Sequence, residues 1–308
     1  MSKKNDLSTV LDLAIKASEG GRAGDGYRVG DRTYETYITN AEWARFVEEM
    51  PESAKQKFAT GGFEMAEKGG RPPKMACYGS SSRMMYRLAH KVAGMDFEKC
   101  LPTSFGGPGA FLDGFRATED GYLFIEAKCH EPYHAPYGES NPCATSPAYC
   151  DLYEYIARET EGALVCRVVS RDDTARKAKV YFESYGQTME YFDMKQMICH
   201  LLGVATGLAR GTFDENLGLD FWYLVYDPTE LDMEETAGER VCEIYGKLCE
   251  ECIDVDFNGL FAVLLRYLRD VKKVGHMTDD AIDACATRLA VTLCNQDLFG
   301  ILLGEDGN

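Results

Sequence analysis

Asp113, Glu126 and Lys128 are the residues of this chain whose types and spacing best suit chemistry. All three lie in the segment Ala110–Glu131, AFLDGFRATEDGYLFIEAKCHE. A hard cation such as Mg²⁺ prefers oxygen ligands, and one or two carboxylates with water and a substrate phosphate can hold it. The cation polarises a phosphodiester and lowers the pKa of a bound water, while a nearby lysine orients the water or offsets developing charge. The trio therefore suits metal-dependent hydrolysis.

A β-hairpin is the element that must position these side chains. The segments Phe111–Thr118 and Tyr122–Ala127 are rich in aromatic and β-branched residues, which favour strands. Between them stands Asp120-Gly121, and Asp-Gly is the strongest short hairpin signal. We therefore expect two antiparallel strands joined by a two-residue turn at Asp120 and Gly121.

The register of this hairpin decides whether the three side chains meet. A turn at that position pairs Asp113 with Lys128 and Phe115 with Glu126, and paired residues point to the same face of a sheet. The trio then shares one face, and the carbonyl of Ala127 offers a further metal ligand. A three-residue loop closed by a glycine bulge would instead separate Asp113 from the other two.

An aspartate, a hairpin and then Glu-x-Lys resembles the motif of the PD-(D/E)xK nuclease superfamily, which includes restriction endonucleases and nuclease domains of recombination proteins. The resemblance implies a Mg²⁺-dependent phosphodiesterase acting on DNA, with Mn²⁺ as an alternative metal. It makes Asp113 and Glu126 metal ligands and Lys128 the catalytic lysine. The chain has Leu112 where the name of the superfamily has proline, at a position that varies among its members.

The superfamily core begins with a helix, and Ser80–Gly94 is a suitable candidate because serines that can cap a helix precede MMYRLAHKVAG. Many relatives carry a glutamate on this helix, but Ser80–Gly94 contains no acidic residue. Glu64, Glu67 or Glu98 would have to substitute for it from outside the helix.

A second helix is expected over Glu183–Gly203, after the hairpin, and it carries Lys195, Gln196 and His200. A helical lysine or glutamine after the Glu-x-Lys strand is a recurrent addition to this active site, so the resemblance implies that Gln196 is catalytic. The order of elements over Tyr78–Asp227 resembles poorly characterised bacterial members of the superfamily.

The charge of the chain opposes easy DNA binding. Its formal net charge is -17, whereas nucleic-acid binders usually present a basic face. Acidic residues are dense over 227–251, and basic residues gather in Lys68–Lys91 and Arg167–Lys179. These two basic segments either contact phosphates or are solvated surface charges. DNA is the expected partner, and a basic protein partner or a homo-oligomer is an alternative way to offset the charge.

Twelve cysteines are scattered along the chain, and without an export signal we expect reduced thiols. Cys249 and Cys252 have CxxC spacing, but they lie on one face of a predicted helix without a second CxxC. A looser group with zinc-ligand chemistry follows the hairpin, and His130 in it lies two residues past Lys128 on the same strand face. The group consists of Cys129, His130, His134, Cys143 and Cys150.

These patterns predict an α/β fold with a restriction-endonuclease-like core, a mixed sheet of about four to six strands flanked by helices. Further strands are expected at Ala163–Ser170, Ala178–Phe182 and Leu219–Tyr226, and closing helices at Val241–Glu251, Leu260–Val271 and Asp279–Leu293. We divide the chain into an N-terminal helical segment (1–74), a PD-(D/E)xK nuclease-like core (75–230) and a C-terminal helical extension (231–308), packed as one compact domain.

No apolar run is long enough to cross a bilayer, and the first residues lack the apolar core of a secretory signal, so we expect a cytoplasmic protein. Three hypotheses remain open. The chain is a Mg²⁺-dependent DNA nuclease, a catalytically inactive module of the same fold that serves binding or assembly, or an unrelated Cys/His metal-binding protein.

Overall fold

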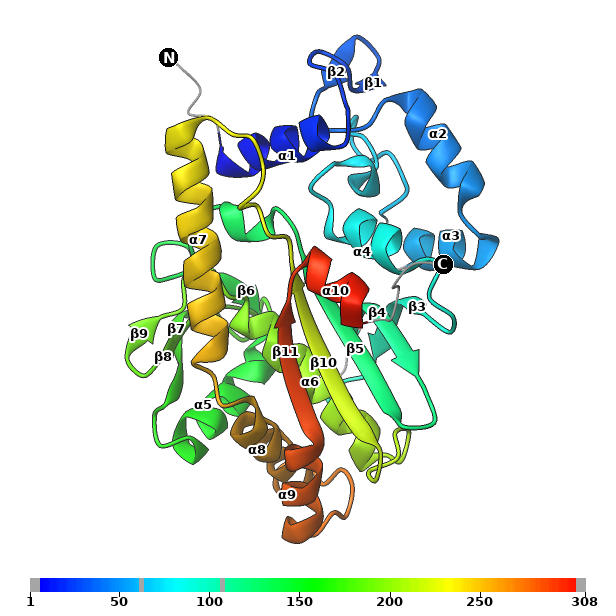
Figure 1. Cartoon of the computed structure of the whole chain (residues 1–308). Helices are drawn as coiled ribbons and strands as arrows, with labels where there is room; N and C mark the ends of the chain where they lie inside the picture. The colour runs from blue at the N-terminus through cyan, green and yellow to red at the C-terminus, as the bar shows by residue number, and fades with distance from the viewer. Residues whose placement is uncertain (1–5, 61–63, 106–108, 303–308) are drawn as a thin grey trace.

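A central mixed sheet organises the computed structural model, which describes residues 6–60, 64–105 and 109–302. Within those residues the sheet has five strands in the order β11-β10-β5-β4-β3 (Figure 1). The strands β3, β4 and β5 are successive antiparallel neighbours, β10 runs parallel to β5, and β11 runs parallel to β10. Their bounds are β3 Asp96–Leu101, β4 Ala110–Ala117, β5 Gly121–Lys128, β10 Gly218–Val225 and β11 Leu289–Cys294. The expected α/β class is confirmed.

Helices cover both faces of this sheet. Side chains alternate between the faces along each strand, and both faces carry apolar residues. Phe124 and Phe221 pack in one buried cluster with α6 and α8, whereas Ile125 and Leu224 pack in a second cluster with α1 and α4. In Figure 1, α10 lies in front of the sheet and α6 behind it. The helices are α1 Leu7–Ser18, α2 Asn40–Glu49, α3 Glu52–Thr60, α4 Ser81–Ala89, α5 Cys150–Glu159, α6 Met194–Ala209, α7 Glu235–Ile253, α8 Phe257–Asp270, α9 Asp279–Arg288 and α10 Gln296–Leu302.

The helix α6 packs against the sheet, and two glycines allow the close approach. A Cβ on Gly203 would lie 2.7 Å from the Cβ of Leu101 on β3. A Cβ on Gly207 would lie 2.4 Å from the ring of Phe213. Gly203 therefore sets how closely α6 approaches β3, while Gly207 leaves room for Phe213, which packs against Phe124 of β5.

The prediction that this helix starts at Glu183 is wrong, since α6 starts at Met194. Tyr185 and Gly186 both have positive φ, 47° and 79°, and form the turn between β8 and the short strand β9. Two such residues in a row form the two-residue hairpin turn that suits the twist of β-strands. The segment before α6 is therefore a hairpin.

A smaller sheet holds the strands predicted at Ala163–Ser170 and Ala178–Phe182. They form β7 and β8, but they pair with each other and with β6 and β9 instead of joining the central sheet. The pairing of β7 with β8 is interrupted by a bulge between Val168 and Ser170. The bounds are β6 Cys143–Thr145, β7 Leu164–Asp172, β8 Lys177–Ser184 and β9 Gln187–Thr188.

Two further differences from the expected elements lie near the ends of the chain. The helix predicted over Asp279–Leu293 divides into α9 and the strand β11, which pairs with β10 along its length. The N-terminal segment contains a hairpin of β1 (Tyr27–Val29) and β2 (Arg32–Tyr34) among its helices. Among the described residues, no helix has the length and apolar character that crossing a membrane requires.

Candidate functional site

The hairpin of β4 and β5 forms, but its register differs from the prediction by two residues. Phe115 pairs with Phe124 instead of Glu126. The turn residues are Glu119 and Asp120, between Thr118 and Gly121, and Thr118 donates its N–H to the carbonyl of Gly121 at 2.8 Å. A shift of two residues keeps the side chains of a regular hairpin on their predicted faces, and Phe115 and Phe124 both pack in the cluster of α6. The strand β4 is irregular at Asp113, because Gly114 pairs with Ile125 whereas Leu112 packs in the cluster of Phe124 instead of that of Ile125.

Gly121 is not a turn residue, and its lack of a side chain has another cause. A Cβ at this position would lie 2.6 Å from the carbonyl oxygen of Gly218, at the start of the neighbouring strand β10. The turn is instead stabilised by Thr118, whose hydroxyl accepts hydrogen bonds from the N–H groups of Asp120 and Gly121 at 3.3 and 3.2 Å. The Asp-Gly signal thus combines a turn residue with a close approach of two backbones.

The strands β4 and β5 part where Asp113 stands. Their last pair is Gly114 with Ile125, and beyond it the N–H of Ala127 donates to Oδ2 of Asp113 at 2.8 Å. The side chain of Asp113 thus occupies the place of a backbone acceptor. Because the N–H and C=O of one strand residue point to the same neighbouring strand, the carbonyl of Ala127 also faces this gap.

Along the neighbouring strand β3, the side chains switch from one face of the sheet to the other beside Asp113. Phe97 pairs with Gly114 and Lys99 with Leu112, which leaves Glu98 opposite Asp113. Glu98 has a φ of 51°, unusual for a residue with a side chain. As a result Phe97 packs in the cluster of α1 and α4, whereas Leu101, further along β3, packs in the cluster of α6.

Glu126, Lys128 and Gln196 are in direct contact. The amine of Lys128 donates to Oε1 of Glu126 at 2.6 Å and to Oε1 of Gln196 at 2.6 Å. Glu126 and Lys128 are only 2% and 8% exposed, while Asp113 and Gln196 are half-buried at the edge. Gln196 is held in the first turn of α6, where its N–H donates to Oδ1 of Asp193 at 2.9 Å. Glu126, Lys128 and Gln196 are thus gathered on the side of the sheet covered by α6, and Asp113 is near enough for the charges of Glu126 and Lys128 to affect it.

Burial and neighbouring charges together shift the pKa of all three charged groups. It raises the pKa of Glu126 to about 7, against the opposing effect of the Lys128 cation. It also raises the pKa of Asp113 well above its usual range, and the negative charge of Glu126 adds to that rise. Burial alone would lower the pKa of Lys128, but Glu126 and other anions outweigh it, and the amine stays protonated. A divalent cation beside the carboxyl groups would favour their ionised forms.

His200 completes the buried group. Its Nδ1 lies 3.4 Å from Oε2 of Glu126, yet neither atom has a hydrogen-bond partner among the described residues. Burial, followed by the charge of Lys128, lowers the pKa of His200 to about 3, so the ring is neutral at pH 7. The contact is therefore not an ion pair. One oxygen of Glu126 stays buried without a partner, which is a costly arrangement for a carboxylate.

Two of the three glutamates suggested as substitutes lie near the carboxyl pair. Burial raises the pKa of Glu98 to about 8, and the next causes are the charges of Asp113, Glu64 and Glu126. Glu64 itself pairs with Lys74 at 3.1 Å. Glu67 accepts a hydrogen bond from the hydroxyl of Tyr27 instead. Of these three glutamates, Glu98 on β3 is the one whose pKa is raised by both Asp113 and Glu126.

The predicted cysteine and histidine group does not form, and His130 joins different residues. The strand β5 ends at Lys128, and His130 has the helical backbone angles φ -93° and ψ -10°, so it does not continue the face of Lys128. Its Nδ1 lies 2.8 Å from Oδ1 of Asp12, whose Oδ2 accepts from the thiol of Cys77 at 3.4 Å. Among the described residues, Asp12, Cys77 and His130 form a group of three ligand-type side chains whose ligand atoms lie within 4.8 Å of one another.

Asp12 was missed because nothing in its neighbourhood resembles a ligand motif. It lies on α1 and is buried beside Leu11 and Ile15 on the apolar face of the helix. A carboxylate on an apolar helix face is a signal that it has a partner, since buried charges are paired. Burial alone would lower the pKa of His130, but hydrogen bonds with Asp12 and Cys77 raise it to about 11.

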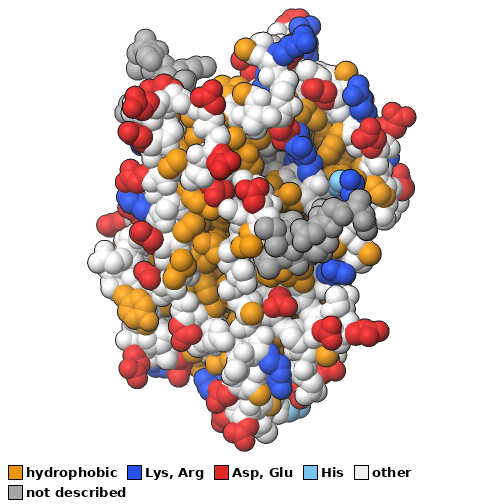
Figure 2. Space-filling model, in the orientation of Figure 1, with side chains coloured by type: hydrophobic (Ala, Val, Ile, Leu, Met, Phe, Trp, Pro, Cys, Tyr) orange, Lys and Arg blue, Asp and Glu red, His pale blue; other side chains and the backbone are white. Residues whose placement is uncertain are grey.

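Several basic residues of the segments proposed as phosphate contacts pair with acidic residues of the chain itself. Figure 2 shows acidic side chains spread over the visible face, with basic ones interspersed. Arg83 and Arg87 both contact Glu19. Other pairs are Arg167 with Glu183, and Arg171 with Asp151 and Asp173.

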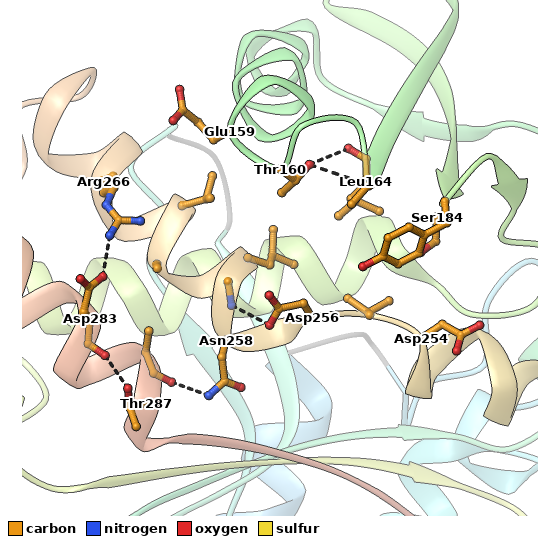
Figure 3. A pocket seen from close by; sticks show the side chains of 18 residues that line it. Glu159, Thr160, Leu164, Ser184, Asp254, Asp256, Asn258, Arg266, Asp283 and Thr287 are labelled. Atoms are coloured by element: carbon orange, nitrogen blue, oxygen red, sulfur yellow. Dashed lines mark hydrogen bonds and ion pairs between the residues drawn. The ribbon is translucent and has the colours of Figure 1, made fainter.

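A hollow of about 560 Å³ lies elsewhere, where α5, α8 and α9 approach β7 and β8. Several of its polar groups form hydrogen bonds or ion pairs within the wall of the hollow (Figure 3). Arg266 pairs with Asp283 at 2.5 Å, Asn258 donates to the carbonyl of Ala286, and Asp256 caps α8 at Gly259. None of Asp113, Glu126, Lys128 and Gln196 lines it. This hollow is separate from the predicted chemistry.

Comparison of the chain with protein-family models, with curated proteins and with solved structures gives no match.

Proposed function

We propose that this protein is a Mg²⁺-dependent nuclease that hydrolyses phosphodiester bonds, with DNA as its substrate and Mn²⁺ as an alternative metal. One observation carries the proposal. Glu126, Lys128 and Gln196 are in contact beside the point where β4 parts from β5, and Asp113 stands at that point. Carboxylates beside a lysine are the groups that metal-assisted hydrolysis requires.

The order of elements also supports a restriction-endonuclease-like core. The helix α4 precedes the antiparallel strands β3, β4 and β5, and α6 then leads to β10, which is parallel to β5. The resemblance to the PD-(D/E)xK superfamily rests on the order of helix, hairpin and helix within this series.

The residues of the gap suit a hard cation. Asp113 and Glu126 would hold Mg²⁺ with the carbonyl of Ala127, and the unpartnered Oε2 of Glu126 is a free oxygen ligand in a buried place. The bound metal would supply Lewis acidity to the phosphate and lower the pKa of an attacking water. Nearby Glu98 adds a third carboxyl group, whose raised pKa reflects the same concentration of negative charge.

Lys128 is the proposed catalytic cation. Its protonated amine would offset the negative charge that develops on the phosphate oxygens, which is the role of positioned cations in phosphoryl transfer. Gln196 keeps the amine directed toward the gap, because it accepts one hydrogen of the amine while Glu126 accepts another. A third hydrogen of the ammonium group is left for substrate or water.

A catalytically inactive module of the same fold is the second candidate. Two observations favour it: Lys128 is only 8% exposed, and basic side chains such as Arg83 and Arg167 are already paired with acidic ones. In that case the protein would bind a protein partner or a second copy of itself and cut no nucleic acid.

Cleavage assays distinguish the two candidates. Purified full-length protein is incubated with single-stranded and double-stranded DNA and with RNA, in Mg²⁺, in Mn²⁺ and in EDTA. Metal-dependent cleavage that Asp113→Asn and Lys128→Met each abolish supports the nuclease. Absence of cleavage of every substrate in both metals, with protein that is folded by circular dichroism, favours the inactive module.

A further inference from the structure

A second group of ligand-type side chains lies on the opposite side of the sheet from Glu126 and Lys128. It joins three distant parts of the chain: Asp12 from α1, Cys77 after the short helical turn Lys74–Ala76, and His130 after β5. One ligand atom of each lies within 4.8 Å of the others. Carboxylate oxygen, thiolate sulfur and imidazole nitrogen are the three ligand types that zinc takes in proteins.

We propose that Asp12, Cys77 and His130 form a zinc site that fastens α1 to the core. The proposal is independent of nuclease activity.

The spacing of the three groups is close to that of ligands around a tetrahedral ion. Ligands at the usual zinc distances lie about 3.3–3.8 Å from one another in a tetrahedron. Nδ1 of His130 lies 2.8 Å from Oδ1 of Asp12, and Sγ of Cys77 lies 3.4 Å from Oδ2 of the same carboxylate. Around an ion the first distance would lengthen by about 0.5 Å, and the second already lies in the tetrahedral range.

A glycine keeps the space beside the ligands clear. A Cβ on Gly79 would lie 1.9 Å from Oδ1 of Asp12 and 2.9 Å from Nδ1 of His130. The backbone of this glycine also positions the histidine, because the N–H of His130 donates to the carbonyl of Gly79 at 3.3 Å. The backbone at Gly79 therefore helps to position the side chains of Asp12 and His130, in addition to the contact between them.

The charges of the site would balance with zinc bound. Metal ligands bind in their deprotonated forms, and Zn²⁺ with a neutral imidazole, a thiolate and a carboxylate carries no net charge. Cys77 and Asp12 are 4% and 5% exposed, which makes this neutrality important. The His130 side chain is 24% exposed, which gives water access to the fourth position.

Metal analysis of the full-length protein tests the site. Protein purified without an affinity tag or chelator should contain stoichiometric zinc. After zinc is removed, Co²⁺ should give the strong thiolate-to-cobalt absorption in the near ultraviolet. Cys77→Ser should remove that absorption and lower zinc affinity at least about tenfold in competition with a chromophoric chelator. Cys252→Ser and His134→Ala are the matched controls and should bind as the wild type does.

Wild-type protein that holds no stoichiometric zinc and gives no thiolate absorption with Co²⁺ overturns the proposal. Retention of that absorption by Cys77→Ser also overturns it. If Cys77→Ser does not fold, the wild-type cobalt spectrum alone decides, and Asp12→Asn supplies the second variant, with an expected loss of affinity. Wild-type protein that contains zinc but cuts no DNA would count against the nuclease only.

Discussion

The amine of Lys128 lies 2.6 Å from Oε1 of Glu126, two residues earlier on the same strand. Residues two apart on a strand point to one face, so no turn or register is needed to bring this pair together. What the fold adds is the cover of α6, which buries both groups and places Gln196 on the other side of the amine.

Replacement of Lys128 by methionine should abolish most cleavage. We expect a fall of at least about 100-fold in kcat, because the variant loses a positioned cation at the phosphate. The free energy of unfolding should fall by up to about 3–5 kcal/mol, since Glu126 loses its partner. Lys247→Met, which removes a lysine from the exposed pair with Glu243, is the control and should cleave normally. Equal cleavage by both variants would remove Lys128 from the proposed mechanism.

Gln196 should act by positioning Lys128. Gln196→Leu keeps the size of the side chain but cannot accept a hydrogen bond from the amine. We expect kcat to fall about 10–100-fold with little change in the Mg²⁺ concentration needed for half-maximal rate. Gln187→Leu on the exposed strand β9 is the matched control. A change in metal requirement without a change in kcat would place Gln196 in metal binding instead.

His200 should make the fold sensitive to acid. Its pKa in the folded protein is about 3, against 6.5 for an ordinary histidine. Below that ordinary value the unfolded chain takes up the proton and the folded protein does not, so stability is full at neutral pH and falls as the pH drops toward 3. The stability advantage of wild type over His200→Gln should therefore be smaller at about pH 5 than at about pH 7.5 in urea unfolding. A difference that does not change with pH would contradict the neutral state of His200.

Gly79 should tolerate no side chain. Gly79→Ala places a methyl group 1.9 Å from Oδ1 of Asp12, and we expect a loss of about 1–3 kcal/mol in urea unfolding. The control is Gly246→Ala on α7, where a Cβ would meet no atom within 4 Å. That change should raise stability by about 0.5–1 kcal/mol, because alanine favours a helix. Equal effects of the two substitutions would mean that Asp12 and His130 move aside at little cost.

Local patterns predicted the elements that carry most of the candidate site. Ser80 caps α4 as expected from its sequence, and the apolar run from Leu219 forms β10 beside β5. The register error of two residues left Phe115 and Phe124 on one face, because an even count across the turn decides the face. Gly121 was misread as a turn residue. The position needs a glycine because the carbonyl of Gly218 lies close to it, and Gly218 is 97 residues further along the chain (218 minus 121).

Long-range contacts explain the remaining differences. The segment from Leu289 reads as the end of a helix, yet the free edge of β10 takes it up as β11. Tyr185 in a left-handed conformation conceals a turn, because only the glycine after it is a usual turn residue. Asp12 and His130 stand 118 residues apart, and no spacing rule joins them. In each case a partner elsewhere in the chain decides the local structure.

The strand β7 forms the outer edge of the smaller sheet among the described residues, and its two exposed valines, Val168 and Val169, lie at the bulge. A bulge twists the strand and breaks the even spacing of its free N–H and C=O groups. Arg167 and Arg171 add charge on either side of it. Another strand therefore finds no regular edge to extend, so this apolar spot can stay in water without causing the protein to aggregate through its sheets.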